Sequence, residues 1–160
     1  MRFLLVDRVF EWSAHERMTG VKNITMSEDF FEHHFPRYPV MPGVMMLESL
    51  AQLAGWLEAA STDFENWLLL DGVVQSKFYG LALPGDQLHL EVTAKPCDEP
   101  GEKLFRGVGK IEKKRCIVTG FRCRAVPMLD IESPEEQRLL FNVLTREVTR
   151  LASGKRRRMQ

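Results

Sequence analysis

Two side chains in the first part of the chain are of types that transfer protons in enzymes. His34 stands before Phe35 and Pro36, and Glu48 follows fourteen positions later within a long apolar run. A neutral imidazole can accept a proton near neutral pH. A carboxyl group in an apolar site has a raised pKa and can keep a proton to donate. By type, His34 could therefore serve as a base and Glu48 as an acid.

Each of these residues also has a purely structural explanation. Gln52 lies four residues after Glu48, so the two share one face of a helix and could be joined by a buried hydrogen bond. Because burying an unpartnered carboxylate is costly, the residues by themselves favour this bond as the reason for Glu48. His33 and His34 could suggest a metal pair. Neighbouring side chains of an extended chain point to opposite sides, however, and no cysteine or carboxylate stands at ligand spacing, so we expect no metal site.

The segment that carries Glu48 is expected to be a buried helix. From Val44 to Ala60 the sequence is rich in Leu, Met and Ala, which favour helices, and it has no β-branched residue after Val44. Its apolar residues cover nearly the whole circumference, as in helices that are buried on most sides. Pro42 and Gly43 precede it, and proline is tolerated at a helix start because the first N–H groups have no intrahelical partner.

Three segments after this helix alternate apolar and polar residues, which predicts half-buried antiparallel strands. They are Leu88–Ala94, Leu104–Glu112 and Arg115–Val126, with turn signals at 84–86 and 99–101. Gly107 and Gly109 would weaken a strand unless something bulky, such as the helix or a ligand, approaches that face. A helix that is apolar all round needs a sheet that curls around it. We therefore predict an α+β hotdog fold, with a curled antiparallel sheet wrapped around a long central helix.

The last part of the chain is expected to add a C-terminal helix. Ser133 suits the N-cap, Pro134 suits the first helical position, and Glu136 completes a capping box. The amphipathic stripe that follows predicts a helix from about residue 134 to residue 151 that docks on the rest of the protein. The stripe consists of Leu140, Val143, Leu144, Val148 and Leu151. We divide the chain into a domain at 1–126, an extension at 127–154 and a basic flexible tail at 155–160.

Composition argues against several classes of function. Lys plus Arg and Asp plus Glu number 22 each, so no overall charge favours nucleic acid or a membrane surface. The three cysteines have no paired or C-x-x-C spacing, which argues against a disulfide framework and a zinc knuckle. No apolar run reaches the roughly 18 residues of a membrane span, and the run at the N-terminus is too short for a signal peptide. We expect a cytoplasmic protein without stable membrane insertion.

The stretch around His34 resembles the signature of bacterial 3-hydroxyacyl-acyl carrier protein dehydratases of type II fatty acid synthesis. That family reads roughly H-F-P-x-x-P-x-M-P-G-V, with a glutamate fourteen residues after the histidine in an E-x-x-A-Q context. This spacing selects His34 over His33, and the resemblance covers about residues 5 to 126. The matching residues are His34-Phe35-Pro36, Pro39, Met41-Pro42-Gly43-Val44, Glu48, Ala51-Gln52, Lys77-Phe78 and Pro84-Gly85-Asp86-Gln87-Leu88.

The resemblance implies an activity and a role for each site residue. His34 would remove the C2 proton of a 3-hydroxyacyl thioester on acyl carrier protein, and Glu48 would protonate the departing hydroxyl, without a cofactor. The N–H of Gly43 would stabilise the negative charge of the thioester oxygen, and its missing Cβ would let the substrate approach closely. The carbonyl of Val40 would hold the His34 ring, and Gln52 would position Glu48.

The resemblance also implies a homodimer in which each active site takes His34 from one subunit and Glu48 from the other. Trimers of such dimers are common in the family. The sequence departs from the family pattern at His33, where glycine is usual, and at Tyr79-Gly80-Leu81, which replaces a basic stretch and bears on carrier-protein docking. Two alternatives remain open. One is a hotdog thioesterase, which needs no such His–Glu pair, and the other is a non-catalytic acyl-binding hotdog subunit.

Overall fold

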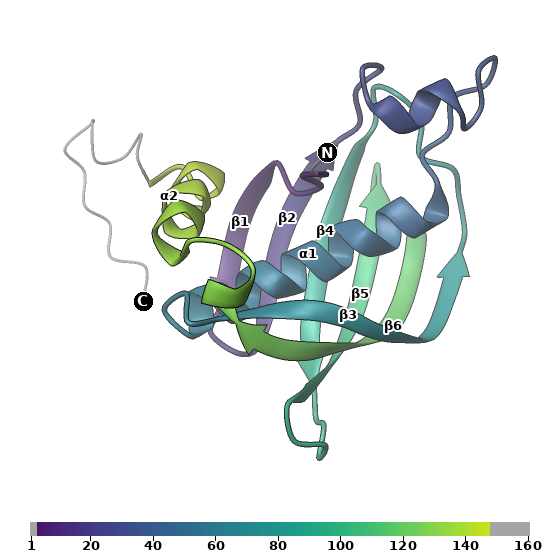
Figure 1. The fold of residues 1–160 in the computed structure, drawn as a ribbon. Coiled ribbons are helices and arrows are strands. Elements are labelled where there is room, and N and C mark those ends of the chain that lie inside the picture. Colours follow the sequence, from purple (N-terminus) through teal and green to yellow (C-terminus); the bar gives the residue numbers. More distant parts are fainter. Residues whose placement is uncertain (1–2, 148–160) are drawn as a thin grey trace.

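The computed structural model describes residues 3–147, which form one six-stranded antiparallel sheet, two α-helices and two short 3₁₀-helices (Figure 1). The strand order is β1-β2-β4-β5-β6-β3, so β1 and β3 are the two edges. The strands are β1 Arg8–Ser13, β2 Arg17–Asn23, β3 Asn66–Phe78, β4 Gln87–Lys95, β5 Glu102–Ile111 and β6 Lys114–Pro127. The helices are η1 Asp29–Glu32, α1 Gly43–Ser61, η2 Met128–Asp130 and α2 Pro134–Leu144.

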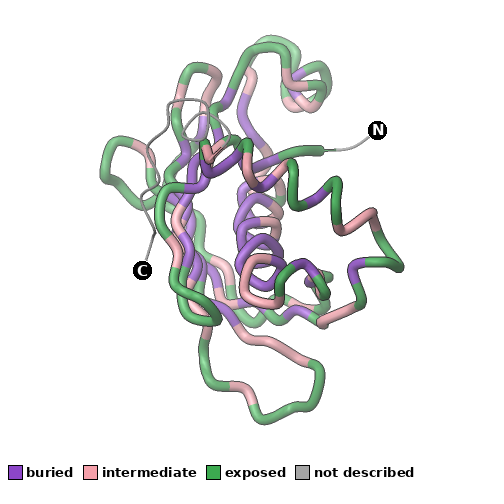
Figure 2. Tube along the Cα trace, turned by 90° about the vertical axis from the view of Figure 1, so that its left-hand side faces the viewer, coloured by how far each residue is buried: buried purple, intermediate pink, exposed green. Residues whose placement is uncertain are grey.

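The helix α1 is the centre of the fold, and the sheet curls around it (Figures 1 and 2). Twelve of its nineteen residues are buried, and Leu50 and Leu53 are fully enclosed. The helix predicted at 44–60 is confirmed, and it extends one residue further at each end. The predicted arrangement, an antiparallel sheet curled around a long central helix, is confirmed with it. Within residues 3–147, no helix is long and apolar enough to cross a membrane.

Gly107 on β5 shows how closely α1 approaches the sheet. An added Cβ at this residue would lie 3.0 Å from Cδ1 of Leu50 and 3.2 Å from Cε1 of Phe121. At Gly109 an added Cβ would lie 2.7 Å from Cγ2 of Ile117 on the neighbouring strand. The bulky neighbour expected at these two glycines is therefore the packing of the protein itself, and a larger side chain at either position would push that packing apart.

The three strands predicted from alternating patterns are present as β4, β5 and β6, with bounds within two residues of those expected. The strand β3 escaped the pattern analysis because its register against β6 shifts after Leu70 and again after Val73. Such bulges interrupt the alternation of side chains between the two faces. Many of its apolar side chains are also exposed in the single chain. They are Leu69, Leu70, Val73, Val74 and Phe78.

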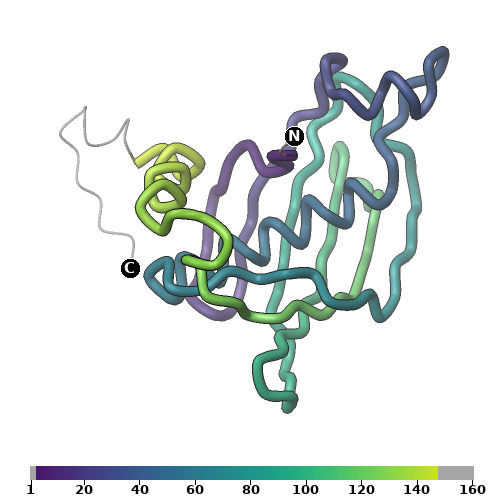
Figure 3. The backbone as a smooth tube through the Cα atoms, in the orientation of Figure 1, coloured from purple at the N-terminus to yellow at the C-terminus, as the bar shows by residue number. Residues whose placement is uncertain are grey.

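Two regions that carry candidate residues lie at opposite ends of α1 (Figure 3). Residues 24–42, which contain η1 and His34, lie at its N-terminal end, and α2 packs near its C-terminal end. The start of the first region is anchored by Lys22, a buried residue of β2. Its Nζ lies 3.5 Å from Oδ2 of Asp7 and 2.5 Å from Oε1 of Glu28. Because a buried ammonium group needs acidic partners, these two ion pairs fix where the loop leaves the sheet.

The helix α2 begins where its capping signals predict. Ser133 is the N-cap, and its Oγ accepts a hydrogen bond from the N–H of Glu136 at 3.4 Å. Pro134 is the first helical residue, where its missing N–H costs no hydrogen bond. One turn later, Arg138 donates to Oδ1 of Asp63 at 2.6 Å, which ties the helix to the segment that follows α1.

The helix predicted as one continuous element from 134 to about 151 is interrupted, because α2 ends at Leu144, and the residues after 147 lie outside the described part of the chain. The hydroxyl of Thr145 donates to the carbonyl of Phe141, and Arg146 has a φ of 61°, in the left-handed region. A left-handed residue directly after the cap turns the backbone out of the helix, which a hydrophobic pattern does not reveal. Val148 and Leu151 of the predicted stripe lie outside the described residues, and so does the predicted basic tail at 155–160.

The docked face of α2 differs from the predicted stripe. Phe141 and Leu144 are buried and Leu140 is partly buried, whereas Val143 is 60% exposed. Val143 lies about 100° around the helix from Leu144 and therefore faces away from the sheet. The aromatic residue, rather than the valine, makes the main apolar contact of this helix.

Phe141 belongs to a cluster of aromatic rings that joins α2 to the core. Its ring centroid lies 6.1 Å from that of Trp12, 5.8 Å from that of Trp56 and 5.7 Å from that of Phe64. These partners come from β1, from α1 and from the segment after α1. Aromatic pairs in such arrangements contribute beyond the apolar area that they bury. The cluster therefore fixes α2 against three separate parts of the chain.

We expect Phe141→Ala to lower the free energy of unfolding by about 3–5 kcal/mol, because it removes a buried ring and leaves a cavity among three others. Val143→Ala on the exposed side of the same helix should change it by less than about 0.5 kcal/mol. Equilibrium unfolding in urea measures both. Equal effects of the two substitutions would show that α2 is not docked through Phe141.

Candidate active site

The loop that carries His34 is held by hydrogen bonds within itself. The N–H groups of His33 and His34 both donate to the carbonyl of Phe30, at 3.4 and 3.0 Å. The N–H of Val40 donates to the carbonyl of His34 at 3.0 Å. The peptide bond between His34 and Phe35 is cis. These bonds close the loop on both sides of His34 and fix the position of its backbone.

The ring of His34 is oriented by the same loop. Its Nδ1 lies 2.7 Å from the carbonyl oxygen of Val40, which is the contact that the family resemblance implies. Because a carbonyl oxygen only accepts, Nδ1 carries the hydrogen, and in the neutral ring Nε2 keeps a free lone pair. His34 is partly buried, whereas the neighbouring His33 is exposed. The arrangement leaves His34 able to accept a proton at Nε2.

Gly43 is the first residue of α1, directly after this loop. Its N–H has no intrahelical partner and lies at the positive end of the helix dipole, so it can bind a developing negative charge. The missing Cβ of Gly43 also has a structural reason. An added Cβ would lie 2.7 Å from Cε1 of Phe78, so the ring at the end of β3 already occupies that space.

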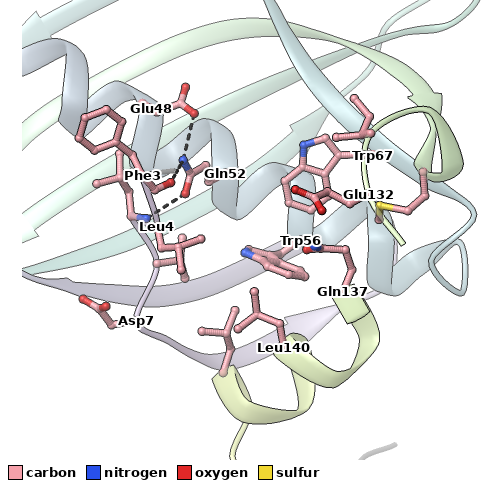
Figure 4. A pocket seen from close by; sticks show the side chains of 15 residues that line it. Phe3, Leu4, Asp7, Glu48, Gln52, Trp56, Trp67, Glu132, Gln137 and Leu140 are labelled. Carbon is pink, nitrogen blue, oxygen red and sulfur yellow. Dashed lines mark hydrogen bonds between the residues drawn. The ribbon is translucent and has the colours of Figure 1, made fainter. Parts of the chain in front are cut away.

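The carboxylate of Glu48 is held by Gln52. Nε2 of Gln52 donates to Oε1 of Glu48 at 3.1 Å, which is the bond expected from the sequence. The same amide donates to the carbonyl of Phe3 at 3.0 Å and accepts from the N–H of Leu5 at 2.9 Å (Figure 4). With three of its four hydrogen-bonding positions in use, the amide has a fixed orientation. It therefore directs one N–H at Glu48.

Glu48 lines a pocket of about 340 Å³ on one face of α1. Gln52 and Trp56 line it too, and they follow Glu48 at four-residue intervals along the same face of the helix. The remaining walls come from the N-terminal segment 3–7, from Trp67 on β3, from the region of η2 and from α2 (Figure 4). This volume lies within the range of small-molecule sites in proteins.

His34 is not among the residues that line this pocket. It lies on the loop before α1, whereas Glu48 lies within the helix and faces the other walls named above. The structure thus brings His34 together with Val40, and Glu48 together with Gln52. Within the described part of a single chain, it does not bring the two pairs together in this pocket.

The sequence interpretation missed several residues around the pocket. The segment at Phe3 and Leu5 acts through its backbone, so its side chains give no signal. Trp67 begins a strand that the alternation did not predict. Gln137 could have been noticed, because it is four residues before Phe141 and seven before Leu144, on the apolar face of α2. A glutamine at such a position calls for a partner or a function.

The cysteines near this region are not candidate nucleophiles. Burial, together with the charges of Glu48 and Asp71, raises the pKa of Cys123 to about 12. Burial also raises the pKa of Cys116. Because the thiolate is the reactive form, both thiols stay protonated and inert near neutral pH. Cys97 is more accessible than either, and all three thiols are free.

Comparison with known proteins identifies the family of this chain. Residues 1–119 match the FabA-like domain, so the chain belongs to the FabA-like family. The 3-hydroxyacyl-[acyl-carrier-protein] dehydratase FabZ of Cupriavidus taiwanensis is 39% identical over 136 residues, which cover 83% of this chain and 87% of that protein. FabZ of Shewanella sediminis is 42% identical over 115 residues, which cover 69% and 74%. The resemblance inferred from the motif around His34 is confirmed.

Solved structures agree with the predicted fold class. The dehydratase heterocomplex ApeI:P from Xenorhabdus doucetiae is similar with a TM-score of 0.55 at 19% identity, covering 71% of this chain and 92% of that one. A mutant of the fluoroacetyl-CoA-specific thioesterase FlK gives a TM-score of 0.60 at 11% identity, covering 80% and 98%. At such low identity the likeness concerns the fold alone, and the hotdog prediction is confirmed.

We expect the folded protein at pH 8 to react with a thiol reagent at Cys97 only. With a pKa of about 12, Cys123 has a thiolate fraction of about one in ten thousand at this pH, and burial restricts access to it and to Cys116. Mass spectrometry after brief alkylation measures the labelled sites, and the same reaction in denaturant should label all three. Rapid labelling of Cys123 in the folded protein would contradict its burial on β6.

Proposed function

We propose that this protein dehydrates 3-hydroxyacyl thioesters carried by acyl carrier protein to trans-2-enoyl thioesters, as a lyase of fatty acid or related acyl-chain synthesis. The observation that carries the proposal is the orientation of His34, whose Nδ1 bonds to the Val40 carbonyl and whose Nε2 is left to act as a base. Membership of the FabA-like family supports it, and so do relatives that bear the name of this dehydratase. The carrier protein as partner comes from those names and from the motif resemblance.

The reaction divides between the two side chains. Nε2 of His34 takes a proton from C2, and the electron pair left on C2 forms the C2–C3 double bond while the C3–oxygen bond breaks. Glu48 donates its proton to the departing hydroxyl, which leaves as water. As C2 loses its proton, negative charge grows on the thioester oxygen, and the N–H of Gly43 at the start of α1 stabilises it. The proton on His34 and the charge on Glu48 then return to their starting states through solvent.

Gln52 has a supporting role in this scheme. Its amide is fixed by the backbone at Phe3 and Leu5 and presents one N–H to Glu48. A side chain held in this way loses little conformational freedom when the substrate binds, so the acid is already in place. Val40 gives the equivalent support to His34 through its carbonyl.

We further propose that the active site is shared across a homodimer. The edge strand β3 is long and carries exposed apolar side chains, and within residues 3–147 it has a neighbouring strand on one side only. Such an edge is a template for pairing with another chain. Antiparallel pairing of β3 with its copy about a two-fold axis would cover Val73, Val74 and their neighbours with the same surface of the partner.

This edge leads directly to the candidate residues. Phe78, at the end of β3, lies against Gly43 at the start of α1, so a partner docked along β3 would reach the His34 loop. Phe35, Tyr38 and Val44 of that region are exposed and apolar in the single chain. A shared site also accounts for the separation of His34 from the pocket of Glu48. Trimers of such dimers, which the resemblance implies, are part of the same proposal.

The alternatives have weaker support. The thioesterase FlK and the ApeI:P complex share the fold with this chain at under 20% identity. A likeness at that level does not indicate a shared activity. A non-catalytic subunit would not need His34 and Glu48 to be held as they are. The cytoplasmic location predicted from the sequence accompanies the proposed function, and the division at residues 126 and 154 remains a prediction.

We expect His34→Ala and Glu48→Gln each to lower kcat for dehydration by about 10²–10⁴-fold, because each removes one of the two proton-transfer groups. His33→Ala is the matched control, and its effect should be far smaller because that side chain is exposed. Formation of the enoyl thioester is followed by mass spectrometry, and circular dichroism checks the fold. A folded His34→Ala variant with near wild-type turnover would show that His34 is not the base of the reaction.

The shared site makes a separate prediction. When inactive His34→Ala and Glu48→Gln chains are mixed equally and allowed to exchange, half of the dimers should contain both kinds of chain. Each such dimer has one site with an intact His34 and an intact Glu48, so about a quarter of the wild-type activity should return.

The controls for this experiment are each variant alone and native mass spectrometry of the mixture, which reports subunit exchange. Mixed dimers without any recovered activity would mean that both residues of a site come from one chain. The proposed chemistry would then stand, but the shared site would not.

A further inference from the structure

Lys22 on β2 is a buried cation that joins two segments far apart in the chain. Its side chain is 6% exposed, and its Nζ lies 3.5 Å from Oδ2 of Asp7 and 2.5 Å from Oε1 of Glu28. Asp7 stands before β1, whereas Glu28 stands directly before η1. Because an ammonium group at this depth is stable only with acidic partners, both segments are held to the same point of β2.

The Asp7 side of this network leads to the proposed acid. Asp7 ends the N-terminal segment that lines the pocket of Glu48 (Figure 4). Its Oδ2 also accepts a hydrogen bond from the N–H of Asn23 at 2.6 Å, so the carboxylate is tied to the end of β2. Two residues earlier in the same segment, the N–H of Leu5 donates to Oε1 of Gln52, whose amide holds the proposed acid. The segment that orients this acid is therefore fixed to β2.

The Glu28 side of the network leads to the proposed base. Glu28 is the N-cap of η1, a position from which a side chain can bond to the N–H groups of the helix. Its side chain makes no such bond and instead reaches Lys22. Its carbonyl accepts from the N–H of Phe31 at 3.1 Å, and the carbonyl of Phe30 accepts from the N–H of His34 at 3.0 Å. These hydrogen bonds link the position of Glu28 to that of the residue that bears the imidazole.

We infer that Lys22 is a positioning residue that acts on both proton-transfer groups. Through Glu28 it holds the loop of His34. Through Asp7 it holds the segment that orients Glu48. The inference rests on the proposed function, because it takes these two side chains as the base and the acid. A small displacement of a reacting group lowers the rate steeply, so we expect an effect on kcat although Lys22 touches no substrate.

The proposed dimer gives this arrangement a second consequence. A shared site takes His34 from one chain and Glu48 from the other, so the two side chains that one Lys22 supports belong to different sites. Each Lys22 therefore contributes to both active sites of the dimer, to the base of one and to the acid of the other. Its two carboxylate partners divide these roles, because Glu28 acts on one site only and Asp7 acts on the other.

The first test follows the loop itself and needs no substrate. In Glu28→Gln, which keeps the shape of the side chain and removes its charge, the backbone amides of residues 29–42 should exchange with deuterium at least about tenfold faster, the effect of losing one charged contact. Glu32→Gln is the matched control, because Glu32 lies on the same short helix and is exposed. Its exchange should match that of the unaltered protein. Unchanged exchange in Glu28→Gln overturns the inference.

The second test places each substitution in one chain of the mixed dimers described above. Their single intact site takes its base from the Glu48→Gln chain and its acid from the His34→Ala chain. Glu28→Gln should lower the recovered kcat about tenfold when the Glu48→Gln chain carries it, and change it less than about twofold when the other chain does. Asp7→Asn should show the opposite pattern. Equal losses from either chain would indicate a purely structural role and overturn the inference.

Lys22→Met tests the cation itself, because methionine keeps an apolar stem without the charge. It should lower the recovered kcat when either chain carries it. Adding Glu28→Gln to the chain that supplies the base should then lower kcat by less than about twofold more, because the two residues act as a unit. Full additivity of the two losses contradicts the link between them. If Lys22→Met does not fold, the results for Glu28→Gln and Asp7→Asn decide.

The outcomes separate this inference from the proposed function. An unaltered protein that forms no enoyl thioester contradicts the proposed function, while the exchange experiment still decides whether the ion pair holds the loop. If both residues of a site come from one chain, mixing restores no activity, and the Glu28→Gln and Glu32→Gln proteins are compared directly. Glu28→Gln should then lower kcat about tenfold with KM within about twofold. An equal kcat for the two variants overturns the inference.

Discussion

The packing of α1 inside the curl of the sheet is the constraint from which the other features follow. A helix buried on most sides can approach β5 only where side chains are absent, which is why Gly107 faces Leu50 and Phe121. The same burial leaves one face of the helix, at Glu48, Gln52 and Trp56, open to a pocket. Every polar group on that face must then find a partner or serve a ligand, because few are tolerated at such depth without one. The candidate site is therefore the part of the α1 surface that the sheet does not cover.

The polar groups on that face are supported from outside the helix. Gln52 is held by backbone groups of a segment that precedes the first strand, and His34 by a carbonyl of its own loop. Neither support depends on a long side chain, so neither costs much conformational entropy. The ion pairs of the buried Lys22 with Asp7 and Glu28 add a fixed starting point for the loop. Together these contacts set up the acid and the base before any substrate is present, which is the usual requirement for efficient proton transfer.

The parts of the protein that could be predicted from sequence are those with a short-range pattern. The apolar run at 44–60 and the alternation of β4, β5 and β6 follow directly from residue type, and the motif from His34 to Gln52 concentrates the site in nineteen positions. The strand β3 could not be predicted because its bulges break the alternation. The end of α2 at Leu144 depends on the backbone conformation of Arg146, which no pattern of apolar residues encodes. The contact of Phe78 with Gly43 joins residues far apart in the chain, and such contacts appear only once the fold is known.

The bonds from Gln52 to Phe3 and Leu5 have a practical consequence for anyone who prepares this protein. They place the support of the proposed acid in the backbone of residues 3–5, ahead of the first strand. A purification tag fused directly before Met1 would therefore end three positions before Phe3, close to the group that orients Glu48. Low activity in such a preparation would report on the tag as much as on the enzyme, and a cleaved or tag-free sample is the proper reference for kinetic work.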